Sequence, residues 1–186
     1  MSSEIVVVYH SGYGHTKRVA DAVARGANAS TVTIDANGNV PDDAWKQLAA
    51  ARAIIFGSPT YMANVSWQFK KFVDASSAVW MKQGWKDKLA AGFSNSAGIN
   101  GDKLVTLQTM VAMAQQHGML WVSTGMMPSN AKASGRDDLN YLASFTGLMT
   151  ATPSDASVEE MHVGDLRTAE QFGKRVADVA SAQSRA

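Results

Sequence analysis

The chain has 186 residues, of which 46% are hydrophobic and 18% are charged, a composition typical of one globular domain with a sizeable core. Its 17 basic and 16 acidic residues leave a net charge of +1 and form no basic stripe, so nucleic-acid binding has no electrostatic support. The sequence contains no cysteine, which excludes disulfides, zinc–thiolate sites, iron–sulfur clusters and thiol nucleophiles, and no apolar stretch approaches the roughly 18 residues of a membrane span.

The first predicted elements are a strand, a tight loop and a helix. An apolar run at residues 5–9 stops abruptly at a loop of hydroxyls and glycines, and apolar residues then recur at three- and four-residue steps over 16–27. This arrangement gathers unpaired backbone N–H groups and the positive end of a helix at one spot, where glycines let the backbone approach a ligand. We therefore predict that the loop binds a phosphate. It reads Ser11, Gly12, Tyr13, Gly14, His15 and Thr16.

The spacing within this loop argues against two common nucleotide-binding loops. A nucleotide P-loop needs four residues between its glycines, followed by Gly-Lys-Ser/Thr. Gly12 and Gly14 fit the first two glycines of a dinucleotide fingerprint, but Lys17 stands in place of the third. The Ser-x-x-Gly-x-Thr pattern after a first strand resembles the phosphate loop of the flavodoxin superfamily, where neutral donors hold the phosphate of FMN. The alternative is a glycine turn that only starts a helix.

The rest of the chain continues to alternate between strand and helix. Four more strands are expected at 31–35, 53–57, 89–94 and 120–123, and four more helices at 42–50, 66–78, 103–116 and 166–180, with an irregular segment at 124–165. Continuous apolar strands separated by helices predict an α/β fold, with a parallel sheet covered on both faces and residues 1–186 in a single domain. In the doubly wound order 2-1-3-4-5, the ligand lies beyond the carboxyl ends of the strands, at the switch point between strands one and three.

The loops after the first, third and fourth strands should therefore carry the chemistry. The loops at 58–64 and 95–101 are rich in hydroxyls, amides and small residues and are nearly free of charge. Such surroundings suit a flat, neutral heterocycle such as isoalloxazine, with backbone amides at its edge and Tyr61 or Met62 over one face. The alternative is that turns of any kind are rich in glycine, serine and asparagine.

A series of motifs then resembles one particular family. In chain order the motifs are Gly57-Ser58-Pro59-Thr60-Tyr61-Met62-Ala63-Asn64, then Phe69, Phe72 and Asp74, then Trp80, Lys88-Leu89 and His117-Gly118-Met119. Over residues 4–125 this order resembles the flavodoxin-like NAD(P)H:quinone oxidoreductases named after the tryptophan-repressor-binding protein. The resemblance implies a flavodoxin-like three-layer sandwich with a five-stranded parallel sheet, FMN as cofactor, and NADH or NADPH as electron donor.

The same resemblance implies roles for individual residues. It places the FMN phosphate on residues 11–16, His117 against the FMN of a neighbouring subunit, and Trp80 beside the substrate space. Read without it, His117 is equally a cap before a helix-ending glycine, Trp80 is core under a loop, and His15 faces either the phosphate or solvent. The expected cofactor-binding set is Ser11, Gly12, Tyr13, Gly14, His15, Thr16, Pro59, Thr60, Tyr61, Met62, Asn64, Asn95, Ser96, Ala97, Gly98 and His117, with Trp80 for substrate.

The chain also departs from the pattern of that family. The run at 96–101 has fewer glycines, the family's long insertion between the second and third strands is missing, and the segment at 124–165 matches poorly. These departures leave the acceptor open, along with the choice between a homodimer and a homotetramer.

The sequence is thus interpreted as an FMN-dependent oxidoreductase that passes two electrons from NADH or NADPH to a quinone or similar acceptor. Both substrates would use one face of the flavin, so ping-pong kinetics are expected. No catalytic side chain is assigned because the flavin carries the reaction, and no metal is assigned because the histidines and glutamates show no ligand spacing. The N-terminus has no basic region or cleavage site, so we expect no signal peptide and a cytoplasmic location.

Two other classes of function stay open. One is an electron-carrier flavodoxin, although such carriers are typically strongly acidic and this chain is nearly neutral. The other is a non-catalytic module that kept the fold and lost the flavin, a reading that the thinned glycine run at 96–101 favours.

Overall fold

The structure is a computed structural model that describes residues 4–183, so residues 1–3 and 184–186 of the predicted domain lie outside it. Its strands are β1 (Ile5–His10), β2 (Ser30–Ile34), β3 (Ala53–Tyr61), β4 (Asn64–Val65), β5 (Leu89–Ser96), β6 (Leu120–Trp121) and β7 (Leu148–Ala151). Its helices are α1 (His15–Ala27), α2 (Ala44–Ala50), α3 (Trp67–Ala75), α4 (Ser77–Trp80), α5 (Lys103–Gln116) and α6 (Val163–Gln183). None of the helices within residues 4–183 combines the length and apolarity needed to cross a bilayer.

The sheet confirms the predicted strand order. Its path is β2-β1-β3-β5-β6, and every pairing along it is parallel. This is the predicted order 2-1-3-4-5, because β5 and β6 are the fourth and fifth parallel strands. The short strand β4 only forms an antiparallel hairpin with the end of β3. The sheet has seven strands where five were expected, and the two extra strands are this hairpin and β7.

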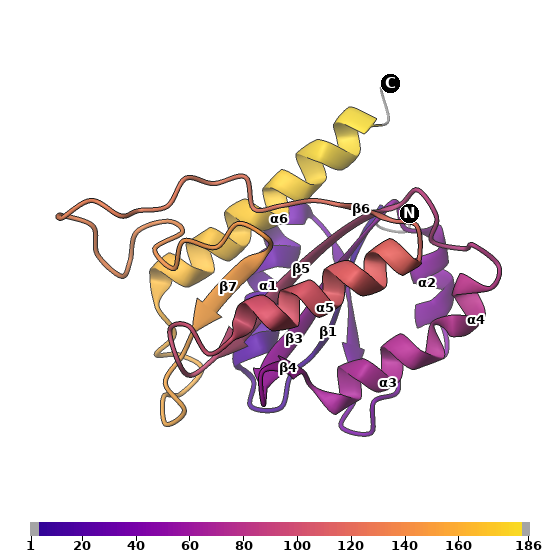
Figure 1. The fold of residues 1–186 in the computed structure, drawn as a ribbon, viewed down its shortest axis with the longest axis horizontal. Helices are drawn as coiled ribbons and strands as arrows, with labels where there is room; N and C mark the ends of the chain where they lie inside the picture. Colours follow the sequence, from indigo (N-terminus) through magenta and orange to yellow (C-terminus); the bar gives the residue numbers. More distant parts are fainter. Residues whose placement is uncertain (1–3, 184–186) are drawn as a thin grey trace.

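The fifth position of the sheet is divided between two short strands. β6 pairs with Leu89 and Ala90 of β5, and β7 pairs with residues 93–96 of the same strand. Between them the chain swings away from the body, as the long orange segment in Figure 1 shows. The expected strand at 120–123 is therefore shorter, and part of the expected irregular segment is a strand. β7 can lie close to β5 because a side chain on Gly147 would meet the carbonyl oxygen of Gly92 at 2.5 Å.

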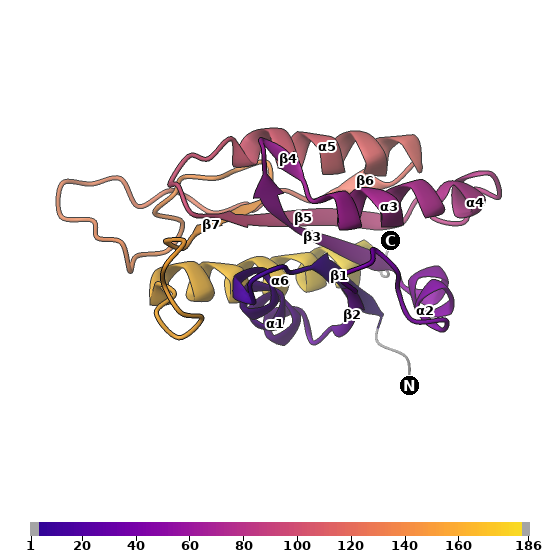
Figure 2. The same cartoon turned by 90° about the horizontal axis from the view of Figure 1, so that it is seen from below.

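Alternation along the strands divides the core between the two faces of the sheet. Val7 and Tyr9 of β1 pack with α1 and α6, whereas Val6 and Val8 pack with the residues of α2, α3 and α5. Figure 2 shows α1 and α6 on one side of the sheet and α3, α4 and α5 on the other. Successive strand residues point to opposite faces, so a β-branched run buries apolar side chains on both.

Two helix predictions need correction. The single helix expected at 66–78 is broken into α3 and α4 at Ser76, whose hydroxyl donates to the carbonyl oxygen of Val73 at 2.6 Å. Ser66 begins α3 by accepting a hydrogen bond from the N–H of Phe69. The last helix, expected at 166–180, begins earlier and ends later, at Val163–Gln183.

Helices α1 and α6 cross closely because each contributes a glycine at the crossing. A Cβ on Gly26 would lie 1.9 Å from the carbonyl oxygen of Glu170, and one on Gly173 would lie 2.0 Å from that of Val23. Both contacts are with backbone, which cannot move aside cheaply.

Gly173→Ala should therefore destabilise the protein, although glycine-to-alanine changes inside helices usually stabilise by about 0.5–1 kcal/mol. Forcing the two helices apart is expected to cost about 1–3 kcal/mol, measured by urea denaturation. Gly135→Ala is the control, because no atom lies within 4 Å of the added Cβ. Equal or greater stability of Gly173→Ala would contradict this account of the crossing.

Candidate functional site

A cleft of about 350 Å³ opens beyond the carboxyl ends of the strands. It is lined by the loop after β1 and the start of α1, by the last residues of β3 and β5, and by the chain after β7. The sequence analysis expected loops at 58–64 and 95–101, but β3 continues to Tyr61 and β5 to Ser96, so the residues it singled out there stand mostly at strand ends. The lining residues are Tyr13, His15, Thr16, Pro59, Thr60, Tyr61, Asn95, Ser96, Ala97, Thr152 and Ser154. None of these is a carboxylate or a lysine, so the cleft is nearly uncharged.

The loop between β1 and α1 is shaped by the hydroxyl of Ser11. Its oxygen accepts hydrogen bonds from the N–H groups of Gly14 at 3.2 Å and Lys17 at 3.1 Å. Gly14 adopts a φ of +90°, a conformation that favours glycine, and caps the helix. Within the described chain, no hydrogen bond uses the N–H groups of Gly12, Tyr13, His15 and Thr16. The loop therefore presents a set of free backbone donors at a helix N-terminus.

The side chains of this loop add neutral donors. Thr16 is buried against the cleft, and its hydroxyl bonds to none of residues 4–183. His15 is half-buried and lines the cleft, with Nε2 at 2.9 Å from the carbonyl oxygen of Ala156. Lys17 is instead paired with Asp21 at 2.8 Å on the exposed side of the helix. An anion held here would meet dipoles and hydroxyls more than formal charges.

The end of β3 places Tyr61, and not Met62, at the cleft. Met62 and Ala63 form the tip of the β3–β4 hairpin with φ of 47° and 63°, and Met62 is 99% exposed. The Tyr61 hydroxyl lies over Gly12, where an added Cβ would meet it at 2.5 Å. Burial raises the pKa of Tyr61, so its phenol stays protonated at neutral pH. Of the two candidates for covering a flat ligand, only Tyr61 is in position.

Several of the loop hydroxyls and amides hold the loops instead of facing the cleft. The Thr60 hydroxyl lies 2.7 Å from those of both Ser94 and Thr106, which ties β3 to β5 and α5. Ser58 accepts the N–H of Ser66 at 3.0 Å, and the Asn64 amide oxygen accepts from Thr109 at 2.9 Å. The polar character of these loops thus has a structural part as well as a ligand-facing part.

Asn95 is oriented by hydroxyls that the sequence analysis did not single out. Its amide oxygen accepts hydrogen bonds from Thr150 at 2.8 Å and Thr152 at 3.0 Å. Thr152 and Ser154 also line the cleft. The sequence did hold a signal for Thr152 and Ser154. They follow the short, mostly apolar run of β7, just as polar residues follow the other strands that end at the cleft.

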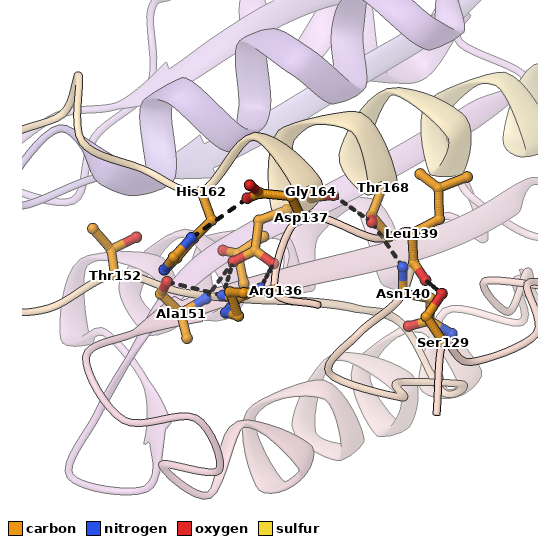
Figure 3. Close-up of polar contacts among 12 residues, drawn as sticks. Ser129, Arg136, Asp137, Leu139, Asn140, Ala151, Thr152, His162, Gly164 and Thr168 are labelled. Atoms are coloured by element: carbon orange, nitrogen blue, oxygen red, sulfur yellow. Dashed lines mark hydrogen bonds and ion pairs between the residues drawn. The ribbon is translucent and has the colours of Figure 1, made fainter. Parts of the chain in front are cut away.

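A buried ion pair fixes the chain where it enters the cleft. Arg136 donates to both carboxylate oxygens of Asp165, at 2.5 and 2.6 Å, and Asp165 also accepts the N–H of Ala151 at 2.8 Å. Arg136 in turn donates to the Ala151 carbonyl oxygen at 3.2 Å. Figure 3 shows Arg136 beside Ala151, the residue before Thr152. The pair thus joins three parts of the chain: the long segment at 122–147 between β6 and β7, the end of β7, and α6.

Lys103 lies beneath the loop after β5. Its ammonium group donates to the hydroxyl of Ser96 at 2.8 Å and to the carbonyl oxygen of Gly98 at 2.5 Å, and its side chain is fully buried. Burial lowers its pKa to about 8. Gly98 therefore serves the cleft through its carbonyl contact with Lys103, and is not itself among the lining residues.

His117 and Trp80 lie away from this cleft, in a pocket between α3, α4 and α5. His117 is 4% exposed, its Nε2 lies 2.9 Å from the Ser76 hydroxyl, and its ring centroid is 4.5 Å from that of Trp85. Burial lowers the pKa of His117, which favours the neutral ring. The structure brings His117 and Trp80 together, but within one chain neither reaches the residues of the cleft.

Comparisons with known proteins place the chain among flavoproteins. Residues 41–133 match a family model described as NADPH-dependent FMN reductase. Flavodoxin FldP of Pseudomonas aeruginosa is 52% identical, covering 95% of this chain and 96% of the relative. An NAD(P)H dehydrogenase (quinone) of Archaeoglobus fulgidus is 32% identical, covering 96% and 97%. The structure of a flavodoxin, WrbA-like protein from Agrobacterium tumefaciens aligns with a TM-score of 0.80 at 51% identity, covering 96% of this chain and 97% of that one.

Asp165→Asn should destabilise the protein by about 3 kcal/mol, because it leaves the Arg136 charge without its partner in a largely buried position. The loss is measured by urea denaturation, and limited proteolysis should cut the segment at 124–147 faster than in the wild type. Asp137→Asn is the matched control, since the one ion pair of Asp137 within residues 4–183 is an exposed contact of 3.7 Å with His162, and its loss should change little. Equal stability of the two variants would show that the buried pair does not hold the segment.

Proposed function

Because this chain belongs to the flavodoxin-like family of NADPH-dependent FMN reductases and WrbA-like proteins, we propose that it is an FMN-dependent oxidoreductase. It takes electrons from NADH or NADPH and passes two of them to a quinone or a similar small acceptor. The observation that carries the proposal is the cleft, in which free backbone donors at a helix N-terminus adjoin a neutral, flat-sided space.

The phosphate of FMN fits the loop at residues 11–16. Among residues 4–183 no hydrogen bond uses the N–H groups of Gly12, Tyr13, His15 and Thr16 in this loop, and the Thr16 hydroxyl adds a side-chain donor at the cleft. The positive end of α1 favours a dianion at this position. A carboxylate in the lining would oppose such a ligand, and the lining contains none.

The isoalloxazine ring fits the other half of the cleft. Tyr61 offers an aromatic face, and Tyr13 meets the Tyr61 ring edge-on with centroids 6.3 Å apart. Asn95, Ser96 and Ala97 also line the cleft, where side-chain amide and backbone groups can reach the polar edge of the ring. FMN, when bound, supplies hydride acceptance and two-electron transfer. The chain's own residues hold and orient the ring, and leave one face open for a nicotinamide or a quinone in turn, which implies ping-pong kinetics.

Assembly into a homodimer or homotetramer belongs to the same proposal. Trp80 and His117 lie outside the chain's own cleft, so they can border a flavin only if it is held by another subunit. The surface of α3, α4 and α5 exposes the large apolar side chains Trp67, Trp80, Leu104 and Val105, which a subunit contact would cover.

An electron-carrier function is the second candidate, and one observation favours it. The relative at 52% identity over nearly the whole chain is named a flavodoxin. Against it stands the near balance of 17 basic and 16 acidic residues, because carriers that dock by charge need a strong net field. A cytoplasmic location remains a prediction under either function.

Thr16→Ala should weaken FMN binding about ten- to a hundredfold, because it removes a hydrogen bond to a charged group worth about 1.5–3 kcal/mol. Binding is measured by quenching of flavin fluorescence as apoprotein is titrated into FMN. Riboflavin, which lacks the phosphate, should bind the wild type far more weakly and should not distinguish it from the variant. Thr31→Ala, on an exposed part of β2, is the control. The phosphate assignment is wrong if FMN and riboflavin bind the wild type equally well.

The FMN-loaded protein should oxidise NADH or NADPH and reduce a benzoquinone in steady-state turnover. Parallel lines in double-reciprocal plots are expected, because the two substrates would use one site in succession. Light scattering on the same sample should give the mass of a dimer or tetramer. A monomer that holds FMN but oxidises neither nicotinamide with any acceptor would favour the carrier instead.

A further inference from the structure

Lys103 occupies a position that is costly for a lysine. It is 0% exposed, and it is the first residue of α5, where the helix already presents its positive end. A cation in this place is opposed both by loss of water and by the helix dipole. Within the described chain, the ammonium group has no ion-pair partner, and its two acceptors are the neutral oxygens of Ser96 and Gly98.

The surroundings leave the positive charge of Lys103 uncompensated. Two other charged groups act on it: Asp165 favours its charged form and Arg136 opposes it. These two are themselves joined as an ion pair, so their effects on Lys103 largely cancel. The pKa of Lys103, lowered to about 8 by burial, still leaves the group mostly protonated at pH 7.

This charge lies directly behind one wall of the cleft. Ser96 receives a hydrogen bond from Lys103 and also lines the cleft, next to Ala97. Ser96 further donates to the Gly98 carbonyl oxygen at 3.3 Å, and its own carbonyl oxygen accepts the N–H of Thr152 at 3.0 Å. The positive charge of Lys103 therefore acts, across the thin loop at Ser96–Gly98, on the part of the cleft where we place the polar edge of the flavin.

We propose that Lys103 is a positioning residue whose buried positive charge, acting through the loop at Ser96–Gly98, favours the reduced over the oxidised state of FMN in the cleft. This inference rests on the proposed function. Hydride transfer from NADH or NADPH carries two electrons and one proton into a neutral ring, so the ring gains one negative charge and the nicotinamide leaves with one positive charge. A nearby cation lowers the free energy of the reduced ring and leaves that of the neutral ring almost unchanged.

The charge of Lys103 also gives the reduction potential a distinct pH dependence. The negative ring formed on reduction raises the pKa of Lys103 above its value of about 8 in the oxidised protein. Below pH 8 the group is protonated in both states and takes up no extra proton. Between pH 8 and the raised pKa of the reduced protein, reduction brings a proton onto Lys103, so over this window the potential should fall more steeply with pH, by up to about 30 mV more per pH unit for a two-electron couple. Above the window Lys103 is neutral in both states and the extra slope ends.

The test compares the reduction potentials of the FMN-loaded wild type, Lys103→Met, Lys103→Gln and Lys103→Arg, by equilibration with a reference dye between pH 6 and pH 10. The Met and Gln variants should prefer reduced FMN about tenfold less, a potential about 30 mV more negative. Both should also lose the steeper slope above pH 8. Lys103→Arg, which keeps the charge, should stay near the wild type at pH 7.

Lys88→Met is the matched control. Lys88 donates to the carbonyl oxygens of Ala49 and Ala51, and burial lowers its pKa too, but it precedes β5 at the opposite end of the sheet from the cleft. Its potential should equal that of the wild type. Thermal unfolding of each apoprotein identifies any variant that fails to fold, and in that case the arginine variant and the wild-type pH profile decide the question.

Three results are distinguishable. A wild type that binds no FMN overturns the proposed function and this inference with it. A wild type that binds FMN but shares its potential and pH slope with Lys103→Gln overturns the inference alone and leaves Lys103 a structural support of the loop. A shift in Met and Gln, absent in Arg and in Lys88→Met, supports both.

Discussion

Parallel pairing of β1, β3 and β5 is the constraint on which the rest of the molecule depends. The register sets Tyr9 opposite Gly57 and Gly57 opposite Phe93, so the carboxyl ends of the three strands lie at one edge of the sheet. Gly57 is required there, because a Cβ on it would lie 2.1 Å from the Phe93 ring. A shift of two residues in any pairing would keep each side chain on the same face of the sheet, so the core would still be apolar. It would, however, move the strand ends apart, and the cleft would be lost.

The cleft is held open by contacts beneath it. The Thr60 hydroxyl bonds to those of both Ser94 and Thr106, and the amide oxygen of Asn95 is held by Thr150 and Thr152. Because these groups satisfy one another, the backbone donors of the first loop and the wall of the third stay available to a ligand. The polar loops thus combine two roles that the sequence alone does not separate.

The long segment at 122–147, between β6 and β7, adds residues to the site without disturbing the sheet. It leaves the edge after β6 and returns as β7 on the same strand, β5, so the fifth position of the sheet is filled in two parts. The Arg136–Asp165 pair secures the return and directs Thr152 and Ser154 into the cleft. A connecting segment that is anchored to the end of a core strand can change which ligand a cleft recognises while the flavodoxin-like fold is retained.

The sequence by itself determined the features that depend on local order: the alternating strands and helices, their order in the sheet, the glycine loop at residues 11–16 and the family, which the comparisons confirm. Apolar periodicity and glycine spacing encode these directly, because each is set by neighbours along the chain. Only the tertiary structure decided that Tyr61 and not Met62 faces the cleft, that Thr152 and Ser154 join it, and that His117 and Trp80 lie elsewhere. It alone paired Arg136 with Asp165 and buried Lys103 behind Ser96. Those contacts depend on how segments far apart in the sequence pack together and on which polar groups are buried by that packing. Neither can be inferred from a local sequence pattern.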